Sequence, residues 1–180
     1  MINTKEIINF WFEECDPKMW FKKNLNFDKL IKSKFSKSID ISLKTSFEDI
    51  HFSSDTYLSY ILILDQFTRN VFRNTPKAFI GDKTALDISK KTISKKFINQ
   101  SNLYYNIFFL MPLMHSEKIS DHELGLPFFK EFTNDNTYKY ALKHKEVIQK
   151  FGRYPHRNNI LGRETTNAEF EFLKLKGNRF

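Results

Sequence analysis

The chain has 180 residues, of which 41% are hydrophobic and 16% aromatic, and its formal net charge is +8. This length suits one domain with its own core, predicted to span residues 1–180, and the apolar content excludes a disordered chain. The charge does not predict nucleic-acid binding. The lysines are scattered at helical spacing among Ser and Asn, as on a solvated surface, and no RNP-type aromatic pattern accompanies them.

Two further classes of protein are excluded by local features. Acidic residues interrupt the first apolar stretch, which is unlike a signal peptide, and the longest apolar run, 107–114, contains Pro112 and is too short to span a bilayer. Cys15 is the single cysteine, so an internal disulfide is excluded. We therefore expect a cytoplasmic protein without a membrane segment. The sequence predicts no oligomeric state.

Apolar residues recur at intervals of three and four along most of the chain, which is the period of amphipathic helices. Phe27, Ile31 and Phe35 illustrate it, whereas residues 56–64 are apolar nearly all round, which predicts a helix enclosed by others. The pattern predicts helices at 3–14, 26–45, 56–72, 82–93, 102–110, 121–132, 137–151 and 166–177. No segment alternates like a strand, so we predict an all-α fold of seven to eight antiparallel helices in a single domain.

Several residues mark the expected helix ends. The sequence predicts N-caps, in chain order, at Asn3, Ser54 or Asp55, and Asp82. Thr166 and Glu169 have the spacing of a capping box, and Pro112 is expected to lie beyond the end of helix 102–110. Gly152 and Pro155 are expected to close helix 137–151.

Arginine is distributed unlike lysine in this chain. There are 23 lysines and 6 arginines, and five of the arginines fall in two windows, 65–73 and 151–166, that contain no lysine. A guanidinium is a planar, permanently charged fork that binds a carboxylate or phosphate through two hydrogen bonds, so the windows suggest anion binding. The alternative is a set of buried structural salt bridges, which also favour arginine.

In the first window, Asp65, Arg69 and Arg73 follow one another at a spacing of four, with Gln66 and Asn70 beside them. These polar side chains share one stripe of the predicted helix, and one acid cannot neutralise two arginines. The stripe is expected to be partly buried, where a charge must be paired or must face a ligand cavity.

The second window repeats the imbalance, because its arginines are accompanied by Glu164 alone. If the two windows meet, we expect a strongly cationic site that binds an anion; if they lie apart, each arginine finds an acid elsewhere. The irregular segment 152–165 is also typical of a functional loop. The predicted ligand-binding residues are Arg69, Arg73, Arg153, Arg157, Asn158, Arg163, Gln66 and Asn70.

Histidines supply the candidates for catalysis. His115 and His156, with Asp65 to orient a ring, are predicted to form a general acid/base set, to which Glu117 and His144 are possible additions. The alternative is that the histidines bond loop carbonyls and that the Ser beside His115 caps the next helix. No metal-binding spacing, Walker loop, GxGxxG or nucleophile elbow is present, so neither a metal nor a cofactor is predicted.

A set of motifs resembles a known family. These motifs are FWF at 10–12, LDQFTRNVFR at 64–73, PLMHSE at 112–117, FGRYPHRNNILGRETT at 151–166 and the closing EFEFL. Together they are similar to the bacterial domain of unknown function 924 over nearly the whole chain. The resemblance implies a right-handed helical stack like that of tetratricopeptide-repeat proteins, and it implies no activity. Thr68 and His122 depart from the family pattern, which has proline and glutamine there; Thr68 suggests a more regular helix.

Two functions follow from these observations. In the first, the arginines bind an anionic small molecule, such as a phosphate- or carboxylate-bearing metabolite, and His156 or His115 moves protons. In the second, a helical superhelix clamps an acidic peptide or a C-terminal carboxylate in its groove. A closed, histidine-lined pocket favours the first function, and a long open groove favours the second.

Overall fold

The computed structural model describes residues 1–51, 53–99 and 101–175, and their regular structure is helical throughout. No strand is present in these ranges, which confirms the all-α prediction. The α-helices are α1 (Thr4–Asn9), α2 (Leu25–Lys44), α3 (Ser54–Ile61), α4 (Thr68–Val71), α5 (Asp82–Ser94), α6 (Leu103–His115), α7 (Ile119–Phe132), α8 (Asp135–Phe151) and α9 (Asn167–Lys174).

Two π-helical turns extend or join these helices. The turn η1 (Phe10–Glu14) continues α1, and η4 (Leu62–Phe67) joins α3 to α4 into one run. Counted in this way, the described residues form eight helical runs, in agreement with the predicted seven to eight. The shorter 3₁₀ turns are η2 (Pro17–Met19), η3 (Phe47–Asp49), η5 (Pro76–Phe79) and η6 (Pro155–Arg157).

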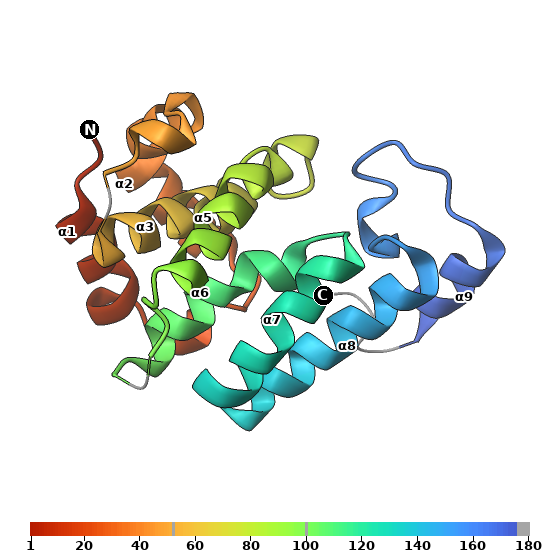
Figure 1. Cartoon of the computed structure of the whole chain (residues 1–180). Helices are drawn as coiled ribbons and strands as arrows, with labels where there is room; N and C mark the ends of the chain where they lie inside the picture. Colours follow the sequence, from red (N-terminus) through yellow and green to blue (C-terminus); the bar gives the residue numbers. More distant parts are fainter. Residues whose placement is uncertain (52, 100, 176–180) are drawn as a thin grey trace.

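Helices that follow one another in the chain pack against each other. α5 contacts α6, α6 contacts α7, and α7 contacts α8. Figure 1 shows α6 between the N-terminal helices α1 to α5 on one side and the pair α7 and α8 on the other. This position explains why α6 is buried along most of its length, from Asn106 to Met114. Among the described helices, none combines the length and apolar character needed to cross a membrane.

Aromatic side chains fill the core between these helices. Trp11 is fully buried and its ring lies 5.4 Å from that of Phe67 and 5.6 Å from that of Phe108. Phe35 lies 4.9 Å from Phe67 on the other side. Burying each ring contributes about 2 kcal/mol relative to leaving it in water, so residues from η1, α2, η4 and α6 are held together here.

Three predicted helix boundaries were wrong. Helix α6 continues through Pro112 to His115, because one missing backbone hydrogen bond is outweighed by the burial of the whole segment. The N-cap of α3 is Ser53, one residue before the predicted pair. Asp82 is the first residue of α5, and its carboxylate binds arginine instead of capping the helix. The run from α3 to α4 also differs from the more regular helix that Thr68 suggested, since η4 interrupts it.

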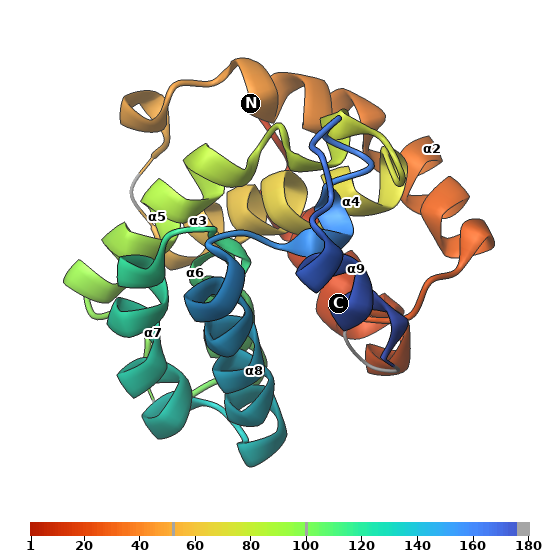
Figure 2. The ribbon, with the colours of Figure 1, turned by 90° about the vertical axis from the view of Figure 1, so that its right-hand side faces the viewer.

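The segment after α8 returns across the molecule. Gly152 ends α8 in the left-handed conformation at φ 68°, and Thr166 with Glu169 forms the predicted capping box of α9. The predicted end of this last helix near 177 lies outside the described residues. Figure 2 shows the loop between α8 and α9 reaching the segment that follows α4. The two arginine windows therefore meet in the fold.

Candidate functional site

Asp65 lies at the bottom of the candidate site, in the π turn η4. The turn is one residue wider than an α-helical turn, because the backbone N–H of Thr68 donates to the carbonyl of Ile63. Such π turns are frequent at functional sites. Asp65 is fully buried, so its carboxylate needs partners from the protein.

Asp65 has three side-chain partners. His115 Nδ1 lies 2.7 and 3.0 Å from its two carboxylate oxygens, Arg69 NH1 lies 3.0 Å from Oδ1, and Gln66 Nε2 donates to Oδ2 at 2.5 Å. Burial alone would raise the pKa of Asp65, but the charge of Arg69 and the hydrogen bonds from His115 and Gln66 outweigh it and hold the pKa below its usual range. Asp65 is therefore ionised at neutral pH.

The hydrogen bond to Asp65 fixes the state of His115. An ionised carboxylate accepts, so Nδ1 carries the proton and Nε2 is the basic nitrogen of the ring. Burial lowers the pKa of His115, and the charge of Asp65 does not fully reverse that effect. His115 is thus a neutral base held in one orientation by a buried acid, an arrangement suited to accepting a proton.

Asp82 joins the two arginine windows. Arg69 donates to both oxygens of Asp82, at 2.9 and 3.0 Å, while Arg157 NH1 lies 3.7 Å from the same carboxylate. The close approach of α5 to η4 depends on Gly81, where a Cβ would lie 2.4 Å from the carbonyl oxygen of Leu64. A single acid thus serves two guanidinium groups, and Arg69 has the better geometry.

Arg157 is held mainly by aromatic rings. Its Cζ lies 4.8 Å from the ring centre of Phe79 and 4.6 Å from that of Tyr154, and the residue is 7% exposed. NH2 donates to the carbonyl of His115 at 3.0 Å, whereas the buried Nε has no hydrogen-bond partner among the described residues. Burial and the charge of Arg69 lower the pKa of Arg157. This guanidinium is fixed in position without a closely paired acid.

The other predicted arginines have closely paired acids. Arg73 binds Asp28 through two hydrogen bonds of 2.7 Å, and Asn70 donates to the same carboxylate at 2.8 Å. Asp28 belongs to α2, so this group ties α2 to α4. It acts as a structural connection at the edge of the site.

Two more pairs hold the segment after α8. Arg153 binds Glu169 at 2.7 and 2.9 Å, and Arg163 binds Glu117 at 2.7 and 3.0 Å. Asn158 is fully buried and donates to Glu169 at 3.2 Å. We call Arg153, Arg163, Glu117 and Glu169 the C-terminal clamp.

These contacts correct the expected shortage of negative charge. Each of the five arginines in the two windows has a carboxylate within 4 Å, contributed by Asp28, Asp65, Asp82, Glu117 and Glu169. Four of these acids lie outside the windows, in other helices or turns, and could not be assigned as partners from the sequence. The structural salt-bridge alternative therefore describes most of the arginines, and Arg157 is the exception.

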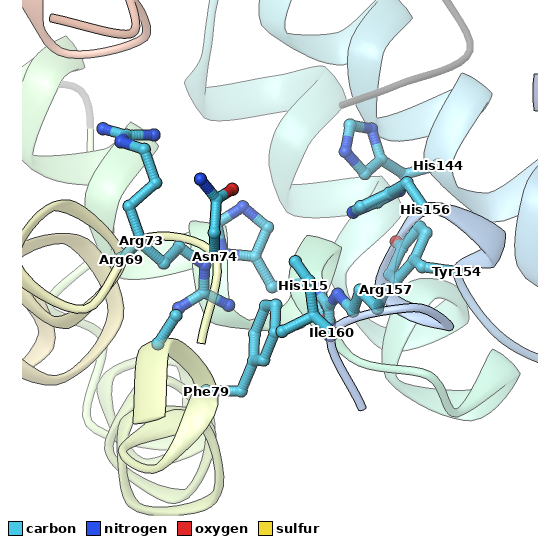
Figure 3. Close-up of a pocket in the computed structure, with 11 residues that line it drawn as sticks. Arg69, Arg73, Asn74, Phe79, His115, His144, Tyr154, His156, Arg157 and Ile160 are labelled. Atoms are coloured by element: carbon cyan, nitrogen blue, oxygen red, sulfur yellow. The ribbon is translucent and has the colours of Figure 1, made fainter. Parts of the chain in front are cut away.

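A cavity of about 240 Å³ opens between the two windows. Figure 3 shows Arg69, Arg73 and Phe79 on one side of it, His144, Tyr154 and His156 on the other, and His115 and Arg157 between them. Its lining consists of Arg69, Arg73, Asn74, Ala78, Phe79, His115, His144, Tyr154, His156, Arg157 and Ile160. The described part of the lining contains three arginines and three histidines and no acid, because the carboxylates lie behind the guanidinium groups.

The histidines of the cavity are neutral. Burial lowers the pKa of His144 to about 3, even though its Nδ1 lies 2.7 Å from the carbonyl oxygen of Tyr140. Burial and the charge of Arg157 lower the pKa of His156 to about 4. The described residues contain no group of three or more His, Cys, Asp or Glu side chains arranged to hold a metal ion.

The structure places the predicted site residues in two groups. Arg69, Arg73, His115, His156 and Arg157 line the cavity, and Asp65 supports it from behind. The predicted ligand-binding residues Gln66, Asn70, Arg153, Asn158 and Arg163 bind acids of the chain instead and do not line it.

Sequence reasoning missed the apolar part of the lining. Phe79 and Ile160 were not predicted, although Ile160 lies within the second window. Tyr154, another lining residue, is the aromatic residue of that window nearest to Arg157 in the sequence. Asn74 is a lining residue in the left-handed conformation at φ 62°, which asparagine tolerates better than most residues. The sequence signal in the second window was the alternation of aromatic and basic side chains over 151–157, which marks Tyr154 but neither Phe79 nor Ile160.

Fold and cavity together define an all-helical protein with a nitrogen-rich pocket between its two arginine windows. The chain belongs to the family described as bacterial protein of unknown function (DUF924), whose sequence pattern matches residues 7–177. A solved structure of a protein of unknown function from Agrobacterium tumefaciens is similar, with a TM-score of 0.84 at 28% sequence identity. That similarity covers 95% of this chain and 96% of the other. A comparison with curated proteins gives no match.

Proposed function

We propose that the cavity binds a small anionic ligand through Arg157. The observation that carries the proposal is the composition of the described lining, in which three arginines supply hydrogen-bond donors and no acid is present. A buried guanidinium without a closely paired acid is costly unless a ligand satisfies it. Arg157 meets that description, since its nearest carboxylate oxygen lies 3.7 Å away.

The size of the cavity supports a small molecule over an acidic peptide. A volume of about 240 Å³ lies below the usual range for drug-sized ligands, roughly 300–1,000 Å³. Three histidines lie on its wall, which is the lining expected for a small-ligand pocket, but the cavity is partly open to solvent. A peptide clamp would instead need a long groove with alternating side-chain pockets.

A second candidate function is acid/base catalysis on that ligand. It is favoured by the contact between Asp65 and His115, in which a buried carboxylate fixes the ring and leaves Nε2 as the base. The described lining contains no Ser, Thr or Cys, so the residues present support proton transfer and not a covalent intermediate. Proton-detected ¹⁵N spectra of His115 test this arrangement: the Nδ1–H tautomer is expected at pH 7, and an Nε2–H tautomer would contradict it.

The binding proposal is tested by thermal unfolding of the full chain with acetate, benzoate, sulfate or inorganic phosphate, each against sodium chloride at equal ionic strength. An anion present at ten times its dissociation constant stabilises the folded protein by about 1.4 kcal/mol, or about 4 °C. Arg157→Lys should weaken that anion about tenfold, because the planar fork is lost. Arg163→Lys is the matched control and should leave the affinity unchanged.

Two results would overturn the proposal. One is the absence of any stabilisation beyond that of chloride with all four anions. The other is an equal loss of affinity in Arg157→Lys and Arg163→Lys, which would show that the anion does not distinguish the cavity from the C-terminal clamp.

A further inference from the structure

We propose that the ligand is a small monocarboxylic acid with an apolar body, whose carboxylate binds Arg157 and whose body contacts Phe79 and Ile160. This inference rests on the proposed function and specifies the class of ligand. Three properties of the cavity lead to it: its volume, the pairing of its charges and the position of its apolar wall.

The volume limits the part of the ligand inside the cavity to about one ring and a carboxylate. A cavity on the order of 150 Å³ holds benzene, and the cavity here measures about 240 Å³. Most of a nucleotide or of a stretch of peptide would lie outside this space. A branched aliphatic acid or a monocyclic aromatic acid fits it.

The charges favour a single negative charge on the ligand. Three carboxylates lie behind the lining: Asp65 and Asp82 both pair with Arg69, and Asp28 pairs with Arg73. Arg69 and Arg73 each donate two hydrogen bonds to one of these acids, which leaves Arg157 as the loosely paired guanidinium of the described lining. A phosphate monoester carries about −1.5 to −2 at neutral pH, and its second charge would lie near Asp82 without compensation.

The apolar wall comes from the two chain segments that meet at the cavity. Ala78 and Phe79 belong to η5, and Ile160 follows η6. Arg157 lies against the same Phe79 ring, so a carboxylate bound to this guanidinium brings the rest of the ligand to the wall. Inorganic phosphate or sulfate would leave these apolar surfaces uncovered, whereas a ring or branched chain would bury them.

The test measures dissociation constants of the full chain by isothermal titration with matched probes. Benzoate and isovalerate carry one charge and an apolar body. Acetate lacks the body, benzamide lacks the charge, and phenyl phosphate adds a second charge. At pH 7 we expect benzoate or isovalerate to bind at least tenfold more tightly than each of the other three.

A pair of loop variants locates the apolar contact. Ile160→Ser should weaken the better of benzoate and isovalerate about tenfold and change acetate binding less than twofold, because the lost contact is with the apolar body. Leu161→Ser, at the exposed neighbouring residue, is the control and should change neither.

The outcomes separate the two proposals. If phenyl phosphate binds more tightly than both apolar carboxylates, the monocarboxylate inference is wrong and anion binding stands. If benzamide matches benzoate, or Ile160→Ser has no effect on either apolar carboxylate, the inference is also wrong. If none of these anions binds, anion binding itself is refuted.

Discussion

The C-terminal clamp and the cavity use the same residue type in different ways. In the clamp, Arg153 and Arg163 each donate two hydrogen bonds of 2.7–3.0 Å to one glutamate. In the cavity, Arg157 lies between these two in sequence, yet its nearest acid is 3.7 Å away and already bound by Arg69. The difference teaches that a run of arginines does not define a binding site. Arg157 differs from the other arginines because the fold fixes its guanidinium but places no carboxylate within hydrogen-bond distance of it.

The largest loss of stability is expected when the C-terminal clamp loses the carboxylate of Glu117. Glu117→Ala should lower the free energy of unfolding by about 3 kcal/mol, because Arg163 loses its carboxylate and the buried Tyr154 loses the acceptor of its backbone N–H. Urea unfolding followed by circular dichroism measures this loss.

The control for this variant is Glu171→Ala in α9. Glu171 pairs with Lys174 at an exposed position, where an ion pair contributes less than about 1 kcal/mol. A similar loss in both variants would show that the clamp is no stronger than a surface ion pair, and the contrast with the cavity would fail.

A second prediction is that the cavity and the C-terminal clamp lose stability in different pH ranges. Burial lowers the pKa of His156 from 6.5 to about 4, so the unfolded chain binds a proton first as the pH falls. The stability that the neutral ring contributes is complete above pH 6.5 and is lost between pH 6.5 and 4, by up to about 1.4 kcal/mol per pH unit. His156→Gln should reduce the pH dependence of the unfolding free energy in this window by the share of His156, while His144, whose pKa is also lowered, continues to contribute.

The clamp should respond in a lower window. Hydrogen bonds from Arg153 hold the pKa of Glu169 at about 2, below the ordinary 4.5, so its contribution is complete above pH 4.5 and is lost towards pH 2. Glu169→Gln should reduce the pH dependence of the unfolding free energy between pH 4.5 and 2 and leave it unchanged between pH 6.5 and 4.5. If either variant changes both windows equally, the two regions do not titrate independently.

Much of the fold could be predicted from the sequence, because helical periodicity and capping are local signals. The capping box of Thr166 and Glu169 is an example, since both partners lie within one turn. Pro112 misled the prediction because its effect depends on tertiary packing: enclosure of α6 by other helices sustains the helix through the missing hydrogen bond.

The site could be predicted only in part, because its charges are balanced over long sequence distances. Asp65 and His115 are 50 residues apart, and Arg73 and Asp28 are 45 apart. The distribution of arginine in the sequence identified the two windows as candidate anion-binding segments. It did not show which arginine lacks a closely paired acid. That distinction depends on Gly81, whose missing side chain lets α5 bring Asp82 to Arg69 and Arg157.

The smallest expected effect on stability is the sharpest test of the contrast between clamp and cavity. Without ligand, Arg157→Lys should change the free energy of unfolding by less than about 1 kcal/mol. The lysine loses the bond to the His115 carbonyl and the stacking of the guanidinium on Phe79 and Tyr154. A methylene, however, replaces the buried Nε that has no partner among the described residues, which removes an unfavourable contribution of similar size. Arg163→Lys should cost more, because the two hydrogen bonds to Glu117 cannot both be kept by an ammonium group. Parallel urea titrations of the two variants measure the difference. If Arg157→Lys proves the more destabilising, Arg157 is a structural residue like its neighbours, and the case for a ligand at this guanidinium is lost.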